Sequence, residues 1–130
     1  MKKKPKILII KSRYNNTASL SYSAESFLKQ KKISFKKIEV NGSFEIPVSI
    51  VRNINKFDGF VAIGIIIKGK TENFSLISQA ITNSLMELSI TYKKPIGNAI
   101  LTCFNSKQAD ERSNNGEEAA KAVLAVLANE

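Results

Sequence analysis

Residues 64–71 read GIIIKGKT, which brings glycine, lysine and threonine together in the spacing of a phosphate-binding loop. In the pattern G-x-x-x-x-G-K-T, backbone N–H groups surround nucleotide phosphates and the last hydroxyl binds magnesium. Three of the four variable positions here are isoleucine, which is stiff at χ1 and prefers a strand to a sharp turn. The sequence also has no suitably placed aspartate after an apolar strand to hold the magnesium. We therefore expect residues 65–67 to continue a strand, which argues against an NTPase.

The remaining turn, residues 69–71, opens a long helical pattern. Free N–H groups and the dipole at the start of a helix favour a bound phosphate. A plain strand-to-helix turn with Thr71 as the N-cap explains the same residues equally well. On its own, this stretch leaves both interpretations open.

The elements that position this turn alternate along the chain. Apolar, β-branched runs predict strands at 6–11, 33–40, 60–67 and 96–101, the last interrupted by Gly97 and Asn98. Amphipathic spacing predicts helices at 17–32 and 44–55, from Phe74 until Pro95 stops the pattern, and at 105–113 and 116–129. This order predicts an α/β fold: a three-layer αβα sandwich with a four-stranded parallel sheet in flavodoxin-like order, in a single domain of residues 1–130.

The predicted inner faces of the helices are apolar stripes. They are expected to comprise Leu20, Ala24, Phe27 and Leu28; Phe74, Ile77, Ile81, Leu85 and Leu88; and Ala120, Val123, Leu124 and Leu127. Ligands of parallel sheets bind at the carboxyl ends of the strands. Those ends fall at 11–16, 41–45, 65–71 and 101–105, so the unusual short strings of this sequence share one edge.

The composition is that of a globular protein with a large positive charge. The chain has 130 residues, 43% of them hydrophobic, and a formal net charge of +9. No apolar run approaches the ~20 residues of a membrane span, and one cysteine, Cys103, fits a reducing compartment. We therefore expect a cytoplasmic protein with no membrane partner. The lysine clusters at 2–4 and 29–37 lack the stacking aromatics of a nucleic-acid motif, which leaves an anionic ligand or a solvated surface.

Five strings together resemble lumazine synthase from about Lys6 to the C-terminus: SRYN, GSFEIP, IGIIIKGKTENF, PIGNAILT and ADER…NNGEEAA. The resemblance implies a transferase that performs the penultimate step of riboflavin biosynthesis. It condenses 5-amino-6-ribitylaminouracil with 3,4-dihydroxy-2-butanone 4-phosphate to give 6,7-dimethyl-8-ribityllumazine, phosphate and water, without a metal or organic cofactor. It also implies a homo-oligomer with sites between subunits, either a pentamer or a 60-subunit shell.

The resemblance assigns each site residue a role. Tyr14 would stack on the pyrimidine, and residues 65–67 would offer backbone groups to the uracil edge. Asn98 stands where the family usually places a phenylalanine over the pyrimidine. The ribityl chain would meet Ser43, Phe44 and Glu45; the uracil edge would meet Ile65, Ile66 and Ile67; and the phosphate would be held by Lys70, Thr71 and Arg112, the arginine from the same subunit or across an interface.

Residue chemistry alone leaves simpler roles open for three of these positions. Tyr14 is also explained as an aromatic residue of a turn, and Arg112 as a surface charge on a helix. Glu45 is also explained as a carboxylate that favours a helix start, a role compatible with binding a ribityl hydroxyl.

Two departures from the family concern the chemistry. The usual catalytic histidine is replaced by Asn73, in a chain without any histidine, and a usual lysine by Asn115. Asparagine cannot move protons near pH 7 as histidine does, but both substrates are reactive and holding them together accelerates their condensation. Two hypotheses follow: a working and slow lumazine synthase, or a catalytically weak homologue that binds flavin-like ligands or serves as an assembly subunit.

Overall fold

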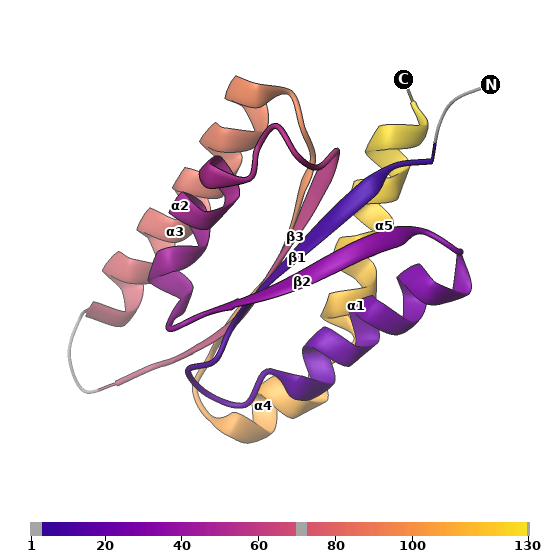
Figure 1. Cartoon of the computed structure of the whole chain (residues 1–130). Coiled ribbons are helices and arrows are strands. Elements are labelled where there is room, and N and C mark those ends of the chain that lie inside the picture. Colours follow the sequence, from indigo (N-terminus) through magenta and orange to yellow (C-terminus); the bar gives the residue numbers. More distant parts are fainter. Residues whose placement is uncertain (1–3, 70–72, 130) are drawn as a thin grey trace.

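In the computed structural model, which describes residues 4–69 and 73–129, four parallel strands form one sheet in the order β2-β1-β3-β4 (Figure 1). Because parallel strands need crossover connections, helices cover both faces of the sheet. The three-layer α/β sandwich and its flavodoxin-like order are therefore confirmed. The strands are β1 (Lys6–Ser12), β2 (Ser34–Val40), β3 (Gly59–Ile67) and β4 (Ile96–Cys103).

The helices divide between the two faces (Figure 1). One face is covered by α1 (Ala18–Gln30) and α5 (Asn115–Ala128), and the other by α2 (Ile46–Arg52) and α3 (Asn73–Tyr92). A short 3₁₀ helix, η1 (Ser43–Glu45), precedes α2, and α4 (Ser106–Glu111) follows β4. In the described residues, no helix combines the length and apolar character that crossing a membrane requires.

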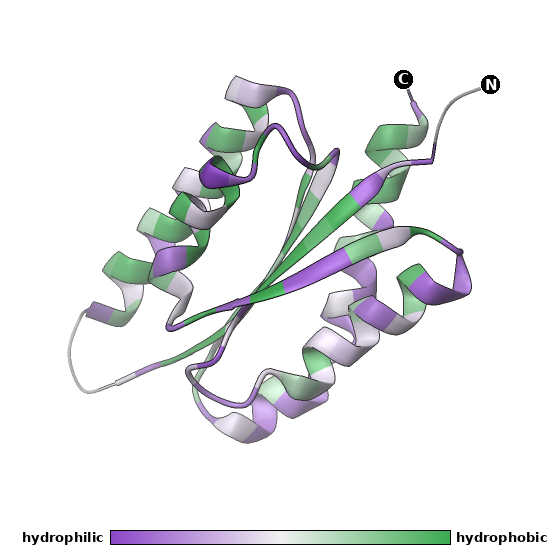
Figure 2. Cartoon of the chain, viewed as in Figure 1, coloured by the Kyte–Doolittle hydropathy of each residue, from purple (hydrophilic) through white to green (hydrophobic). Residues whose placement is uncertain are grey.

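Two hydrophobic clusters, one on each face, hold these layers together, and the interior strands are green in Figure 2. In β1, Ile7 and Ile9 pack on the α1/α5 side, whereas Leu8 and Ile10 pack on the α2/α3 side. All four are fully buried or nearly so, as expected of a central parallel strand. The predicted stripe of α1 is buried as expected, and that of α5 packs against the same core.

Three predicted details are wrong. Strand β4 is continuous, because Gly97 does not break it but lets the backbone of α5 approach at Ala119. The predicted helix at 44–55 is shorter: α2 ends at Arg52, where the Asn53 side chain donates to the Ser49 carbonyl at 2.8 Å. On α3, Ile81 and Leu85 are buried, but Ile77 is 37% exposed.

Candidate active site

The turn after β1 is tied to the ends of both neighbouring strands. The backbone N–H groups of Arg13 and Tyr14 donate to the carbonyls of Val40 and Asn41 at 2.9 and 3.1 Å. Asn15 has a left-handed backbone (φ 67°) and its side-chain Nδ2 donates to the Ile65 carbonyl at 2.8 Å. These bonds fix the turn but leave the Tyr14 ring 71% exposed at the carboxyl edge of the sheet.

The loop after β2 forms a compact helix start. The Glu45 carboxylate oxygen Oε1 accepts from the Gly42 backbone N–H at 2.8 Å, which confirms its predicted helix-start role. Ser43 is buried, and its hydroxyl would collide with a Cβ at position 64, so a larger residue than Gly64 would force the serine side chain to move. Phe44, by contrast, is 66% exposed. This segment therefore anchors one residue against β3 and presents the next two outward.

Residues 65–67 continue a strand as predicted, and β3 ends at Ile67. Ile65, Ile66 and Ile67 pair with the last three residues of β4. On the opposite side, pairing with β1 ends at Ile63, because β1 has already turned away. Backbone groups alternate sides along a strand, so those of Ile67 face the same side as the Ile65 carbonyl, toward the turn that carries Tyr14.

The end of β4 brings positive charge to the same edge. The Arg112 guanidinium Nη1 donates to the Thr102 carbonyl at 3.2 Å and lies 3.7 Å from the Cys103 sulfur. The Lys68 ammonium lies 5.3 Å from the centroid of the Phe104 ring, a cation–π contact. Arg112 directly follows α4, and this short helix brings its side chain back to the end of β4, the strand that precedes α4.

Not every predicted site residue joins this cluster. Asn98 pairs with Ala62, midway along the sheet, and its Oδ1 accepts from the Ile100 N–H at 2.9 Å. It is exposed on the edge strand β4, away from the carboxyl ends. Asn73 is the exposed first residue of α3. Lys70 and Thr71 lie outside the described residues.

Three residues of this edge were not predicted as site residues: Asn15, Lys68 and Phe104. Asn15 lies within the quoted string SRYN, and asparagine is favoured where a non-glycine residue has a positive φ. Lys68 immediately precedes the glycine of GKT, which marks its position near the strand end. For Phe104 the sequence carries no signal, because only the register of β4 sets its side chain beside Lys68.

A model of the 6,7-dimethyl-8-ribityllumazine synthase family matches residues 4–130. The chain belongs to this family. The 6,7-dimethyl-8-ribityllumazine synthase of Bartonella tribocorum is 37% identical, over 98% of this chain and 91% of the relative. The same enzyme of Buchnera aphidicola subsp. Baizongia pistaciae is 40% identical, over 97% and 87%, and that of Agrobacterium fabrum 34%, over 95% and 93%. A solved flavone reductase superposes with a TM-score of 0.52 at 14% identity, covering 93% of this chain and 62% of that one, which shows a shared fold alone.

Within a lumazine synthase family member, the carboxyl edge offers two kinds of contact. The rings of Tyr14, Phe44 and Phe104 are exposed, so they can stack on a flat heterocycle. The Arg112 guanidinium and the Lys68 ammonium supply charge for an anion. The edge can therefore offer stacking to a flat heterocycle and positive charge to an anion.

Proposed function

We propose that the protein is a cytoplasmic, working lumazine synthase. It would condense 5-amino-6-ribitylaminouracil with 3,4-dihydroxy-2-butanone 4-phosphate to 6,7-dimethyl-8-ribityllumazine. Family membership over residues 4–130 supports this reaction. The structural observation that carries it is that Tyr14, Phe44 and Arg112, from three distant parts of the chain, all lie at the carboxyl edge of the sheet.

In this proposal the pyrimidine stacks on Tyr14 and hydrogen-bonds the end of β3. Ile67 is the best placed of the three isoleucines, because its backbone groups face the Tyr14 turn beyond the end of the β1 ladder. Ile66 faces β4 and the Ile65 carbonyl accepts from Asn15, so these two contribute less.

The ribityl chain would lie along the loop after β2. Glu45 remains exposed although Oε1 caps η1, and a carboxylate oxygen has more than one acceptor direction. Phe44 would cover the ribityl chain. Ser43, which is buried against Gly64, would position the loop and contact the ligand only at its rim.

The phosphate of the second substrate would bind near the start of α3. We assign it to Arg112 together with Lys70 and Thr71, which lie outside the described residues. An arginine fork matches phosphate oxygens in charge and geometry. The Arg112 side chain is held at the end of β4 and needs only to exchange its Thr102 contact for the ligand.

A neighbouring subunit would complete the site, in a pentamer or in a 60-subunit shell. Asn98 lies too far along β4 to reach the Tyr14 edge of its own chain. On the same face, α3 exposes Leu76, Met86 and Ile90, which suits contact with a second copy. Asn98 would then face the substrate of that neighbour.

A turnover assay with both substrates and the purified protein tests the proposal. We expect lumazine to form slowly, because Asn73 replaces a proton-transfer group. General acid–base catalysis contributes ~10²–10⁴-fold, so Asn73→His should raise kcat about tenfold or more with little change in either KM. Asn73→Ala serves as the matched control and should not gain a new pH dependence.

Two outcomes would overturn parts of this proposal. An active wild type whose kcat does not respond to Asn73→His would place the limiting proton transfer elsewhere. If neither protein turns over while both bind a lumazine analogue, the protein is the ligand-binding homologue instead.

Asn15 offers a separate test of the edge. Asn15→Gly keeps the left-handed backbone and removes only the amide that binds the Ile65 carbonyl, whereas Asn15→Ala also disfavours the backbone. We expect both to raise the KM for the ribitylaminouracil about tenfold, since one good hydrogen bond is worth ~1 kcal/mol and the Tyr14 turn loosens with it. Asn15→Ala should additionally lower thermal stability. An unchanged KM in both variants would remove the turn from the site.

A further inference from the structure

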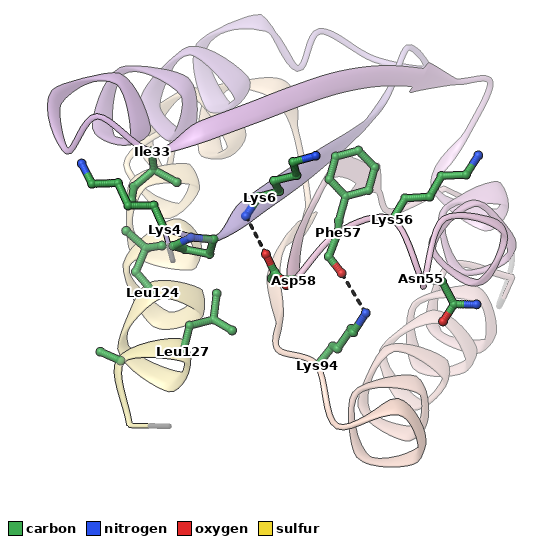
Figure 3. Close-up of a pocket in the computed structure, with 12 residues that line it drawn as sticks. Lys4, Lys6, Ile33, Asn55, Lys56, Phe57, Asp58, Lys94, Leu124 and Leu127 are labelled. Carbon is green, nitrogen blue, oxygen red and sulfur yellow. Dashed lines mark hydrogen bonds between the residues drawn. The ribbon is translucent and has the colours of Figure 1, made fainter. Parts of the chain in front are cut away.

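A cavity of about 740 Å³ lies at the amino ends of the strands, opposite the candidate active site (Figure 3). It is bounded by the start of β1, the segments before β2, β3 and β4, and the last turns of α5. Its volume lies within the ~300–1,000 Å³ typical of small-molecule sites. The proposed condensation uses nothing at this end of the sheet.

One side of the cavity is apolar. Leu124 and Leu127 project from α5, and Ile33 lies beside them (Figure 3). These side chains pack against the α1/α5 core and are only partly buried, while Phe57 packs against the core on the other face. The cavity therefore opens where the two cores meet at the end of the sheet, and it keeps apolar surface in contact with solvent.

The polar part of the lining is strongly basic. It contains Lys4, Lys6, Lys56 and Lys94, and one acidic residue, Asp58. The Asp58 carboxylate oxygen Oδ2 accepts from the backbone N–H of Lys6 at 2.8 Å, so it serves the start of β1. Four ammonium groups around one cavity create a positive potential that attracts an anion.

Helix ends explain only part of this charge. Lysines near helix C-termini offset the dipole, and α1 and α5 both end at this edge of the sheet. Lys4 fits that role, because its Nζ is 3.5 Å from the Lys32 carbonyl. Within residues 4–69 and 73–129, the ammonium groups of Lys6 and Lys56 have neither a hydrogen-bond nor an ion-pair partner, so both can turn to a ligand.

Lys94 adds a preorganised donor. Its Nζ donates to the carbonyl of Ile54 at 2.6 Å and to that of Phe57 at 3.0 Å, and these bonds fix the half-buried side chain against the cavity. The bond to Phe57 is drawn in Figure 3. An ammonium group has three N–H donors, so one is left for a ligand.

We propose that this cavity is a second binding site and takes an amphipathic anion. The carboxylate or phosphate head group sits among Lys6, Lys56 and Lys94, and the apolar body lies against Leu124 and Leu127. The ligand needs both a negative charge and an apolar body. A small anion without an apolar body would leave Leu124 and Leu127 exposed to water, and an apolar molecule without a charge would leave the lysines unpaired.

Fluorescence titration with 8-anilinonaphthalene-1-sulfonate tests the site, because this probe combines a sulfonate with aromatic rings. Reversing one nearby charge should weaken its affinity about tenfold, so we expect this effect for Lys56→Glu and a larger one when Lys6→Glu is added. Lys36→Glu is the matched control, since Lys36 is exposed on β2 and does not line this cavity. Lys56→Gln removes the charge without adding a carboxylate, and we expect a smaller loss of probe affinity. Elution volume and circular dichroism show whether each variant is folded.

A neutral analogue, N-phenyl-1-naphthylamine, separates charge from apolar contact. Its binding should be weaker and should not respond to the lysine substitutions. Octyl phosphate and octanoate should both displace the sulfonate probe, and the stronger competitor identifies the preferred head group. Inorganic phosphate at the same concentration should not displace it.

Four results would overturn the proposal. One is an equal loss for Lys36→Glu and Lys56→Glu, which would mean general charge attraction. Another is displacement by inorganic phosphate as strong as that by octyl phosphate. A loss for Arg112→Ala as large as that for Lys56→Glu would place the probe at the opposite edge of the sheet. Absence of saturable binding would remove the site altogether.

Discussion

The two faces of the sheet are covered by helices to different degrees. On the α1/α5 face, β4 places Ala99, Leu101 and Cys103 in the core, and α5 seals them. On the α2/α3 face, the alternate residues Asn98 and Thr102 of the same strand are exposed. The strand is therefore sealed on the α1/α5 side, whereas on the other side Ile96 and Ile100 are only partly buried against the core and their polar neighbours are exposed.

The helices repeat this difference. The α1/α5 pair turns its apolar stripes inward, whereas α3 buries only Ile81 and Leu85. It leaves Leu76, Met86 and Ile90 between 62% and 68% exposed. Exposed apolar side chains gathered on one element mark an interaction surface. The α1/α5 face is therefore closed by its own helices, whereas α3 leaves apolar side chains exposed on the α2/α3 face, as the proposed contact with a second copy would require; we call them the closed face and the open face.

The largest effect on stability is expected from the closed face. In Gly97→Ala, the new methyl group would collide with the Ala119 carbonyl, so α5 must shift from β4. Overpacking against backbone costs roughly 1–3 kcal/mol, and we expect the upper part of that range in urea unfolding at fixed protein concentration. Thr102→Val, on the open face of the same strand, is the matched control and should change stability little. Equal losses in the two variants would erase the distinction between the faces.

A smaller effect on folding and a larger one on assembly are expected from the open face. Ile90→Lys places a charge on exposed α3 surface, which a monomer tolerates but a buried contact does not. Sedimentation velocity should show smaller assemblies for Ile90→Lys than for the wild type. Val126→Lys on α5, at a site that is 52% exposed, should leave the assembly intact. Dissociation by Val126→Lys and not by Ile90→Lys would place the contact between subunits on α5 and contradict its assignment to α3.

The smallest effect concerns the rim of the closed face, where Glu25 of α1 meets β2. Burial alone raises the pKa of the Glu25 carboxyl, but hydrogen bonds from Ser21 and Lys37 and the charges of Lys37 and Lys29 outweigh it, so the pKa is lowered. The Lys37 ammonium is 3.2 Å from the carboxylate. A lowered folded-state pKa adds stability that is present above the unfolded value and lost as pH falls through the folded one.

Glu25→Gln should therefore cost about 0.5 kcal/mol at neutral pH, as for a partly exposed ion pair. The difference from the wild type should shrink as the pH falls through the acidic range in which the carboxyl titrates. Urea unfolding across that range measures it. A difference that grows on acidification would contradict the sign of the shift.

Local patterns predicted the elements well because they report burial. The β-branched run of β3 and the stripe of α1 each specify a period and a buried side, and both are confirmed. The pattern of α3 misplaced Ile77 because it shows which side is apolar, not whether the same chain covers it. Contacts between distant segments were harder still: the bond from Asn15 to Ile65 joins residues 50 apart, and only the assembled sheet creates it.

The position of β1 has a consequence for synthesis on the ribosome. This strand is the first of the four to emerge, yet it lies inside the sheet between β2 and β3. Its second edge stays unpaired until the chain has been made through β3, and closing that long loop is slow compared with forming the helices between. During this interval the apolar run from Ile7 to Ile10 is exposed on an incomplete sheet. A pause in translation before Gly59 should therefore favour aggregation more than one after Ile67.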